Sequence, residues 1–267
     1  MKTTKETLKL ALREIVQDSL SDFEPKDSLN SKIFDGDKMR PDVRKALLDV
    51  AEKFMEFMRL KFPIKDIILT GSLSNYTWTP FSDLDVHLVT DFDALKKDST
   101  LLSDYFHKAK NLFNNKHDIK IKGFDSEVYV QDEKEKHTST GTYSIQDDKF
   151  ITKPQKFTGE NFDKTDVLKK FEYYAKQIDN LEDRLKRGDN VKDELEQLRY
   201  KMGRFRQGGL DRGGEYSNEN IAYKYLRRKG YLDKAADLED EAQSKELSID
   251  ESKYKYNKGR DYSSYLD

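Results

Sequence analysis

A short apolar run that ends in glycine constrains the fold of this chain more than any other stretch. Residues 66–70 read Asp-Ile-Ile-Leu-Thr and lie between Pro63 and Gly71. This length and composition predict a buried β-strand. Residues 84–89 alternate between apolar and other side chains, which predicts a second strand. The chain should therefore contain a β-sheet in which a glycine turn follows one of the buried strands.

The residues between and within these two strands have chemical uses. Gly71 allows a sharp turn and a close approach to a ligand. Ser72 offers a hydroxyl and a backbone N–H to phosphate oxygens. Asp83 and Asp85 should share one face of their strand, and two neighbouring carboxylates repel unless a cation lies between them. Mg²⁺ prefers such oxygen ligands and keeps other positions for water and phosphates.

This stretch resembles the signature of the DNA-polymerase-β-like nucleotidyltransferase superfamily. The signature is an apolar strand, Gly-Ser, a spacer of about ten residues and Asp-x-Asp between apolar residues, as in Gly71-Ser72 and Asp83-Leu84-Asp85. The resemblance covers residues 41–131. It implies an α+β fold with a small mixed β-sheet flanked by helices, to which many members append a helical domain. It also implies transfer of a nucleoside monophosphate from an NTP to a hydroxyl.

Members of this superfamily carry a third carboxylate on a later strand. Glu127 is the best match, because Val128 and Val130 would then face the core. Asp125 has the same parity as Glu127 and is the second candidate. Asp118, at the start of the preceding strand-like segment, is the third.

The resemblance implies that Asp83, Asp85 and Glu127 are catalytic and bind two Mg²⁺ ions, with Mn²⁺ as a possible substitute. It further implies in-line attack at the α-phosphorus and release of pyrophosphate. We expect Gly71 and Ser72 to bind the nucleotide, with ATP as the expected donor. The acceptor stays open among a protein side chain, an RNA 3′ end and a small molecule.

Four segments follow from composition and periodicity. We expect an N-terminal helix and polar linker over residues 1–40, a catalytic domain over 41–155, a helical domain over 156–250 and a mobile tail over 251–267. The N-terminal helix should span residues 5–20, which carry one apolar stripe.

Two further features of the catalytic segment carry expectations. Residues 93–115 look helical, and their predicted buried side includes Leu101 and Tyr105. His87 should share the face of Asp83 and Asp85. We favour an ordinary half-exposed strand residue for it over a substrate contact.

The helical domain is predicted from spacing. Apolar residues recur every four or three positions over 167–185 and again over 191–205, which predicts an antiparallel helical hairpin. Residues 207–214 contain four glycines and predict a flexible connection. Further helices are expected over 217–229 and 231–246.

Charge is segregated although the net charge is only −2. Residues 199–229 hold nine Lys or Arg against three acids, and residues 237–251 hold seven acids against one Lys. Arg204 and Arg206, with Tyr200 nearby, are predicted to bind the NTP, and nucleic acid is a possible partner. The alternative interpretation is a solvated face paired with the acidic block.

Several classes of protein are disfavoured. The chain has no cysteine, which excludes disulfides, thiolate nucleophiles and Cys-ligated zinc, and its four histidines lack zinc spacing. No apolar run reaches the roughly 18 residues of a membrane span, and the N-terminus lacks an apolar signal-peptide core. We expect a cytoplasmic enzyme without a membrane partner. The alternative is an inactive copy of the fold that binds nucleic acid or protein.

Overall fold

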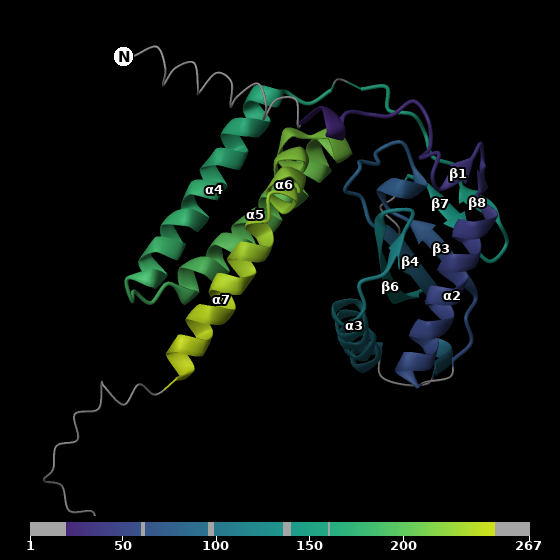
Figure 1. Ribbon diagram of the computed structural model, residues 1–267, viewed down its shortest axis with the longest axis horizontal. Coiled ribbons are helices and arrows are strands. Elements are labelled where there is room, and N and C mark those ends of the chain that lie inside the picture. The colour runs from purple at the N-terminus through teal and green to yellow at the C-terminus, as the bar shows by residue number, and fades with distance from the viewer. Residues whose placement is uncertain (1–19, 60–61, 96–98, 136–139, 160, 249–267) are drawn as a thin grey trace, which may run out of the picture. The chain divides into compact units, whose positions relative to one another are not determined.

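The computed structural model describes residues 20–59, 62–95, 99–135, 140–159 and 161–248, which divide between two compact units (Figure 1). Unit 1 is Met1–Asn161 and unit 2 is Phe162–Asp267. The predicted N-terminal helix over 5–20 lies almost wholly outside the described residues, and the predicted tail over 251–267 lies entirely outside them.

Unit 1 is built on a six-stranded mixed sheet with the order β5-β6-β4-β3-β7-β8. Strands β4 and β6 pair in parallel, and the other neighbours pair antiparallel. The strands are β3 (Asp66–Thr70), β4 (Leu84–Thr90), β5 (Lys120–Ile121), β6 (Phe124–Asp132), β7 (Thr142–Ser144) and β8 (Lys149–Thr152). Both strands predicted from alternation and apolar composition are thus central strands of the sheet.

Helices α2 (Pro41–Met58) and α3 (Ser99–Lys116) bury one face of this sheet (Figure 1). Proline at the first turn of α2 fits a helix start, because its missing N–H has no partner there. Leu84, Val86 and Leu88 alternate along β4 and are fully buried in the same core as both helices. Burying each such side chain contributes about 1.5–3 kcal/mol. The opposite face of β4 carries Asp85. Short 3₁₀ turns complete the unit at η1 (Ser21–Phe23), η2 (Ser72–Ser74) and η3 (Asp93–Leu95).

The predicted buried side of α3 was too wide. Leu101 is 66% exposed and Tyr105 is 40% exposed, so both lie outside the core. The buried stripe consists of Leu102, Phe106 and residues one and two turns further on. Tyr105 instead donates its hydroxyl proton to the carbonyl oxygen of Met58 at 2.7 Å. The buried stripe of α3 is therefore narrower than the apolar content of the helix suggests.

A small hairpin lies within the segment expected to be a polar linker. Strands β1 (Phe34–Asp35) and β2 (Lys38–Met39) pair antiparallel. The Phe34 ring lies 5.3 Å from Tyr143 and 5.5 Å from Phe150, measured between ring centroids. Tertiary contacts between aromatic side chains therefore hold this hairpin, and a two-residue strand leaves no periodicity to detect.

Unit 2 is helical throughout its described elements. These are α4 (Lys164–Lys186), α5 (Lys192–Gly213), η4 (Gly214–Tyr216), α6 (Asn218–Arg228) and α7 (Tyr231–Leu247). The Asp163 side chain caps α4 by accepting from the backbone N–H groups of Thr165 and Asp166. The expected α+β fold, with a mixed sheet flanked by helices and a helical C-terminal region, is confirmed.

The flexible connection predicted over residues 207–214 was wrong, because α5 continues to Gly213. Gly209 is buried where α6 begins, and a Cβ on it would lie 2.5 Å from the Glu219 Cβ and 2.8 Å from the Ser217 hydroxyl oxygen. Glycine here permits close packing of helices instead of flexibility. The helix ends only at Gly214, whose φ of +67° is costly for other residues.

Among the helices of the described residues, none combines the length and apolar character needed to cross a bilayer.

Candidate functional site

The turn after β3 brings backbone and carboxylate into close contact. Gly71 has φ of 75° and ψ of −160°. A Cβ on Gly71 would lie 2.0 Å from Oδ2 of Asp85 and 3.1 Å from its Cγ. The Asp85 carboxylate therefore occupies the space that any larger residue would need. Glycine is required for its torsion angle and for its lack of a side chain.

Hydrogen bonds fix the shape of this turn. The Gly71 carbonyl oxygen accepts from Ser74 Oγ at 2.9 Å and from Asn75 Nδ2 at 2.8 Å. Ser74 Oγ also lies 2.7 Å from the carbonyl oxygen of Gly141. Ser74 and Asn75 are both buried. These interactions hold the start of η2 in place, so a ligand there would meet a preformed surface.

A cluster of hydroxyl groups connects the two halves of the motif. Ser72 donates to Ser82 Oγ at 2.7 Å, and Ser82 Oγ accepts from the backbone N–H of Thr79 at 2.9 Å. Ser82 directly precedes Asp83, so the cluster links the turn at Ser72 to the first carboxylate. Sequence reasoning missed Ser82, and its position next to Asp83 was the available signal.

Strand register places the candidate carboxylates. Strand β4 begins at Leu84, so Asp83 immediately precedes it, whereas Asp85 lies within it. Asp85 pairs with Thr70 of β3 on one side and with Glu127 of β6 on the other. Register partners on neighbouring strands project from the same face, so Glu127 shares the face of Asp85.

The two rival candidates for the third carboxylate lie apart from this register position. Asp125 is exposed and forms an ion pair with Lys120 of β5. Asp118 lies 3.2 Å from the same ammonium group. Glu127 is thus the candidate that pairs with Asp85, whereas Asp125 lies two residues earlier on β6, towards Asp83. The choice of third carboxylate stays a prediction.

Lys110 of α3 contacts the predicted third carboxylate. Its ammonium nitrogen lies 3.3 Å from Oε2 of Glu127 and 5.1 Å from the centre of the Tyr129 ring. Burial, followed by the negative charges of Glu135 and Asp85, raises the pKa of Tyr129. Tyr129 is therefore a neutral wall beside the carboxylates. A lysine on an amphipathic helix gives no sequence signal for such a contact, and sequence reasoning missed Lys110.

His87 has a packing role on this face. It is only 7% exposed, in contrast to the half-exposed residue that the sequence suggested. Its Nδ1 lies 2.6 Å from Oε1 of Gln131, so the ring nitrogen donates to the amide oxygen. The ring also contacts the Tyr129 ring in a tilted arrangement, with an interplanar angle of 51° and a centroid distance of 3.9 Å. His87 and Gln131 thereby fill the sheet face next to Asp85 and Glu127.

The donor set fits a hard divalent cation only in part. Asp83 and Asp85 supply the carboxylate oxygens that Mg²⁺ prefers. Within the described part of the chain, however, no three metal-ligating side chains form a cluster that could hold an ion. Oε2 of Glu127 lies 3.3 Å from the Lys110 ammonium nitrogen, so a cation would compete with this lysine for the carboxylate.

The predicted arginines of unit 2 have different surroundings. Arg204 is exposed, with its guanidinium 5.9 Å from the Tyr200 ring centre. Arg206 is half-buried and donates from Nε to Oδ1 of Asn220 at 3.2 Å, with its guanidinium 5.1 Å from the Tyr223 ring centre. Arg206 thus contributes to packing within unit 2, whereas Arg204 faces solvent.

Part of the basic stretch pairs with acids of unit 2, as the alternative interpretation required. Arg199 contacts Glu239 of the acidic block at 2.5 Å. Burial opposes ionisation of Glu215, but the charges of Lys224 and Arg206 outweigh burial and lower the pKa of that carboxyl group. The charge segregation seen in sequence is therefore partly offset by pairing between helices.

Comparison with known proteins places this geometry in context. Residues 51–206 match a family model described as a nucleotidyltransferase domain, and this range contains Gly71, Asp83, Asp85 and Glu127. Among solved structures, the chain is similar to the STING-associated CdnE c-di-GMP synthase from Capnocytophaga granulosa, with 11% identity over 78% of this chain and 84% of that chain. The TM-score is 0.22, which is too low to support an argument. No curated protein matches the chain.

Proposed function

The chain belongs to the nucleotidyltransferase domain family, and we propose that it moves a nucleoside monophosphate from ATP to an acceptor hydroxyl at the Gly71–Asp85 site. Family membership makes the protein a nucleotidyltransferase. The choice of donor base, the metal dependence and the acceptor are the proposed parts.

One observation carries the proposal of where the chemistry occurs. Asp85 lies directly over Gly71 and faces Glu127 across the parallel strand pair. The turn that is proposed to bind phosphate thus lies at the same end of β3, β4 and β6 as the candidate carboxylates Asp85 and Glu127. Metal-assisted phosphoryl transfer requires these two elements together.

The chain's own residues have distinct proposed roles. Ser72 offers its hydroxyl and backbone N–H to the phosphates, and Ser82 holds the Ser72 side chain in place. Asp83 and Asp85, with Glu127 as third ligand, would hold Mg²⁺ or Mn²⁺, which when bound supplies charge neutralisation and a lowered pKa at the acceptor hydroxyl. Tyr129 and His87 exclude water from the sheet face beside them.

Arg204 is proposed to contact the triphosphate or an acidic acceptor. Its exposed guanidinium supports this role, because charge-assisted bonds from arginine to phosphate are strong and directional. Arg206 was predicted together with it, but its contacts with Asn220 and Tyr223 give it a use within unit 2. Measuring the rate against NTP concentration for Arg204→Ala and Arg206→Ala distinguishes a nucleotide contact from a packing role. Loss of a contact with the NTP raises the Michaelis constant for NTP.

A pair of labels tests the reaction class. Purified protein is incubated with Mg²⁺, cell extract and ATP labelled at either the α- or the γ-phosphate. Nucleotidyl transfer moves the α-label to the acceptor and leaves the γ-label in pyrophosphate. Transfer of the γ-label would identify a kinase instead, and transfer of neither label would support the inactive binding module. Treatment of the labelled product with ribonuclease or protease identifies the class of acceptor.

A further inference from the structure

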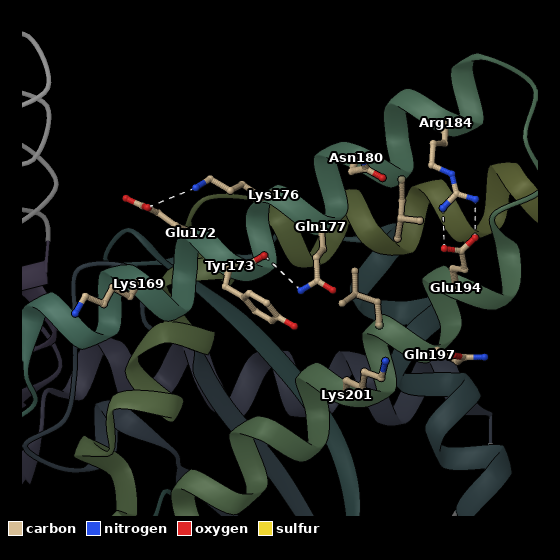
Figure 2. A pocket seen from close by; sticks show the side chains of 12 residues that line it. Lys169, Glu172, Tyr173, Lys176, Gln177, Asn180, Arg184, Glu194, Gln197 and Lys201 are labelled. Carbon is tan, nitrogen blue, oxygen red and sulfur yellow. Dashed lines mark hydrogen bonds and ion pairs between the residues drawn. The ribbon is translucent and has the colours of Figure 1, made fainter. Parts of the chain in front are cut away.

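A groove of about 590 Å³ runs between α4 and α5 of unit 2 (Figure 2). We propose that this groove binds single-stranded nucleic acid. It lies wholly within unit 2, so binding there does not depend on transfer chemistry at the Gly71–Asp85 site.

The α4 wall presents an aromatic ring between two cations. Lys169, Tyr173 and Lys176 are spaced i, i+4 and i+7, so they lie along one side of the helix with neighbours about 5–6 Å apart. Tyr173 is 62% exposed, which is unusual for a side chain of this size. Its ring meets Tyr174 edge-on, with centroids 5.1 Å apart, and this contact limits its motion. An exposed ring with a lysine one turn away on either side suits a stacked base and its adjoining phosphates, although Glu172 also lines this wall.

The α5 wall adds a further cation. Lys201 lines the groove opposite the α4 wall (Figure 2). Within the described residues, neither Lys169 nor Lys201 forms an ion pair, although the charge of Lys169 contributes to the lowered pKa of Asp166. Both ammonium groups can therefore contact a ligand. Lys176 approaches Glu172 only at 3.9 Å, and both side chains are exposed. Such pairs contribute little and are screened by salt, so Lys176 can also serve a phosphate.

Polar groups favour nucleic acid over an apolar peptide. Gln177, Asn180 and Gln197 line the groove and carry amide donors and acceptors that can pair with base edges or sugar hydroxyls. Leu181 and Leu198 are buried beneath them, so little apolar surface is offered. An acidic peptide could satisfy the lysines, but it would leave the Tyr173 face without a partner.

The other end of the groove is already neutralised. Arg184 forms two bonds of 2.7 Å with the Glu194 carboxylate and lies 3.3 Å from Asp189. These contacts occupy its guanidinium and leave no free charge there. The ligand should therefore lie at the end defined by Lys169, Tyr173 and Lys201.

Fluorescence anisotropy with the full chain tests this assignment. The probes are fluorescein-labelled single strands of uridine (RNA) and thymidine (DNA), each about one groove in length and titrated between low and physiological salt. Tyr173→Ala should weaken binding at least about fivefold, whereas Tyr173→Phe, which keeps the ring, should bind like wild type. Lys201→Gln should lower the slope of log K against log salt by about 0.7.

Controls make the result specific. Lys186→Gln removes a charge from the same helix, but this lysine is bound to Glu182 and lies outside the groove, so binding should change less than about twofold. Asp85→Asn should bind the strands like wild type, which separates this site from the transfer site. Equal binding by wild type, Tyr173→Ala and Lys201→Gln would overturn the proposal. Displacement of the strand by polyglutamate at the same charge concentration would also overturn it, in favour of an acidic peptide.

Discussion

The Asp85 carboxylate fits beside residue 71 only because that residue is glycine and has no side chain. A methyl group there would meet Oδ2 at 2.0 Å, in a backbone conformation that L-residues already avoid. Gly36 offers a partial comparison, because its φ of +59° is similar and nothing lies within 4 Å of its missing Cβ. Gly36 shares only the positive φ, because Gly71 also has a ψ of −160° that essentially only glycine adopts, so removal of the Asp85 side chain is needed to isolate the cost of displacing the carboxylate.

We expect Gly36→Ala to lower the free energy of unfolding by about 1 kcal/mol. Gly71→Ala should lower the free energy of unfolding by about 2 kcal/mol more than Gly36→Ala does, because the methyl group overpacks the site in addition to straining the backbone. It should also abolish nucleotidyl transfer. Urea unfolding followed by tryptophan fluorescence reports on unit 1, because Trp78 is the one tryptophan of the chain. In an Asp85→Ala background the extra cost should fall, because the collision with the carboxylate is removed and only the backbone strain at Gly71 remains. Equal costs in the wild-type background would show that the carboxylate does not occupy this space.

Lys110 gives a second prediction at the same scale. Because its ammonium group competes with a cation for Glu127, Lys110→Met should tighten Mn²⁺ binding by the nucleotide-free chain about two- to fivefold. Electron paramagnetic resonance of free Mn²⁺ measures this directly. Lys108→Met removes the same charge from an exposed position of α3 and should change the affinity less. Weaker binding by Lys110→Met would mean that the lysine supports the metal site.

The sequence predicted those site residues whose positions depend on local geometry. The turn at Gly71 and the strand that carries Asp85 follow from local geometry. Parity put both Glu127 and Asp125 on one face of their strand, and only the parallel register of β4 and β6 pairs Glu127 with Asp85. The contacts of Lys110 and Ser82 could not be predicted in this way, although the position of Ser82 next to Asp83 marked it as a residue to consider. Their contacts arise when α3 packs on β6 and when the loop after η2 folds back, and neither event leaves a periodic signal.

Among the elements, α5 shows how composition can mislead. Four glycines over 207–214 resemble a flexible loop, yet three of them lie in the helix α5. Glycine is needed at position 209 because α6 begins too close for a larger side chain. The hairpin of β1 and β2 was missed for the opposite reason. Its two-residue strands are stabilised by distant aromatic rings and not by their own pattern.

The helical state of this segment has a direct test in two glycines of α5. A Cβ on Gly203 would meet nothing within 4 Å, so Gly203→Ala should raise the free energy of unfolding of unit 2 by about 0.5–1 kcal/mol. Gly209→Ala should lower it by about 1–3 kcal/mol, because the methyl group would collide with Glu219 and Ser217. Far-UV circular dichroism during urea unfolding follows the helices. Stabilisation by both substitutions would show that α6 does not pack against Gly209.

The contact between α4 and α7 predicts a dependence on pH. Hydrogen bonds from Lys186 and Lys234 lower the pKa of Glu182 to about 2. This pKa is below that of an ordinary glutamate, so the stabilisation is present above about pH 4.5 and is lost as the pH falls towards 2. Allowing for partial exposure, Glu182→Gln should cost about 1 kcal/mol at pH 7 and almost nothing near pH 2. Asp183→Asn, an exposed neighbour, is the control for thermal melts, and a cost for Glu182→Gln that is the same at both pH values would contradict the assignment.

For the molecule as a whole, the sequence predicted a sheet-based part followed by a helical part, but it did not predict the residue at which one ends and the other begins. The change of periodicity after Pro154 indicated a sheet-based half and a helical half, and the structure has one compact unit of each kind. Segregated charge was a poorer guide. A formal charge of −2 conceals a basic and an acidic stretch, but Arg199 and Glu239 pair across them within unit 2.

We propose that Asp83 and Asp85 hold the metal ions used in nucleotidyl transfer, and the decisive measurement is the rate of α-label transfer by Asp85→Asn. We expect a loss of at least about 100-fold, because a metal ligand is removed. Asp125→Asn, an exposed acid on the neighbouring strand, should retain activity. Without Mg²⁺ the Asp85→Asn chain should melt at the wild-type temperature or above, since removing one of two neighbouring carboxylates relieves repulsion. A rate of α-label transfer by Asp85→Asn equal to that of the wild type would contradict this role of Asp85. A loss of activity that is explained entirely by a lower melting temperature would contradict it as well.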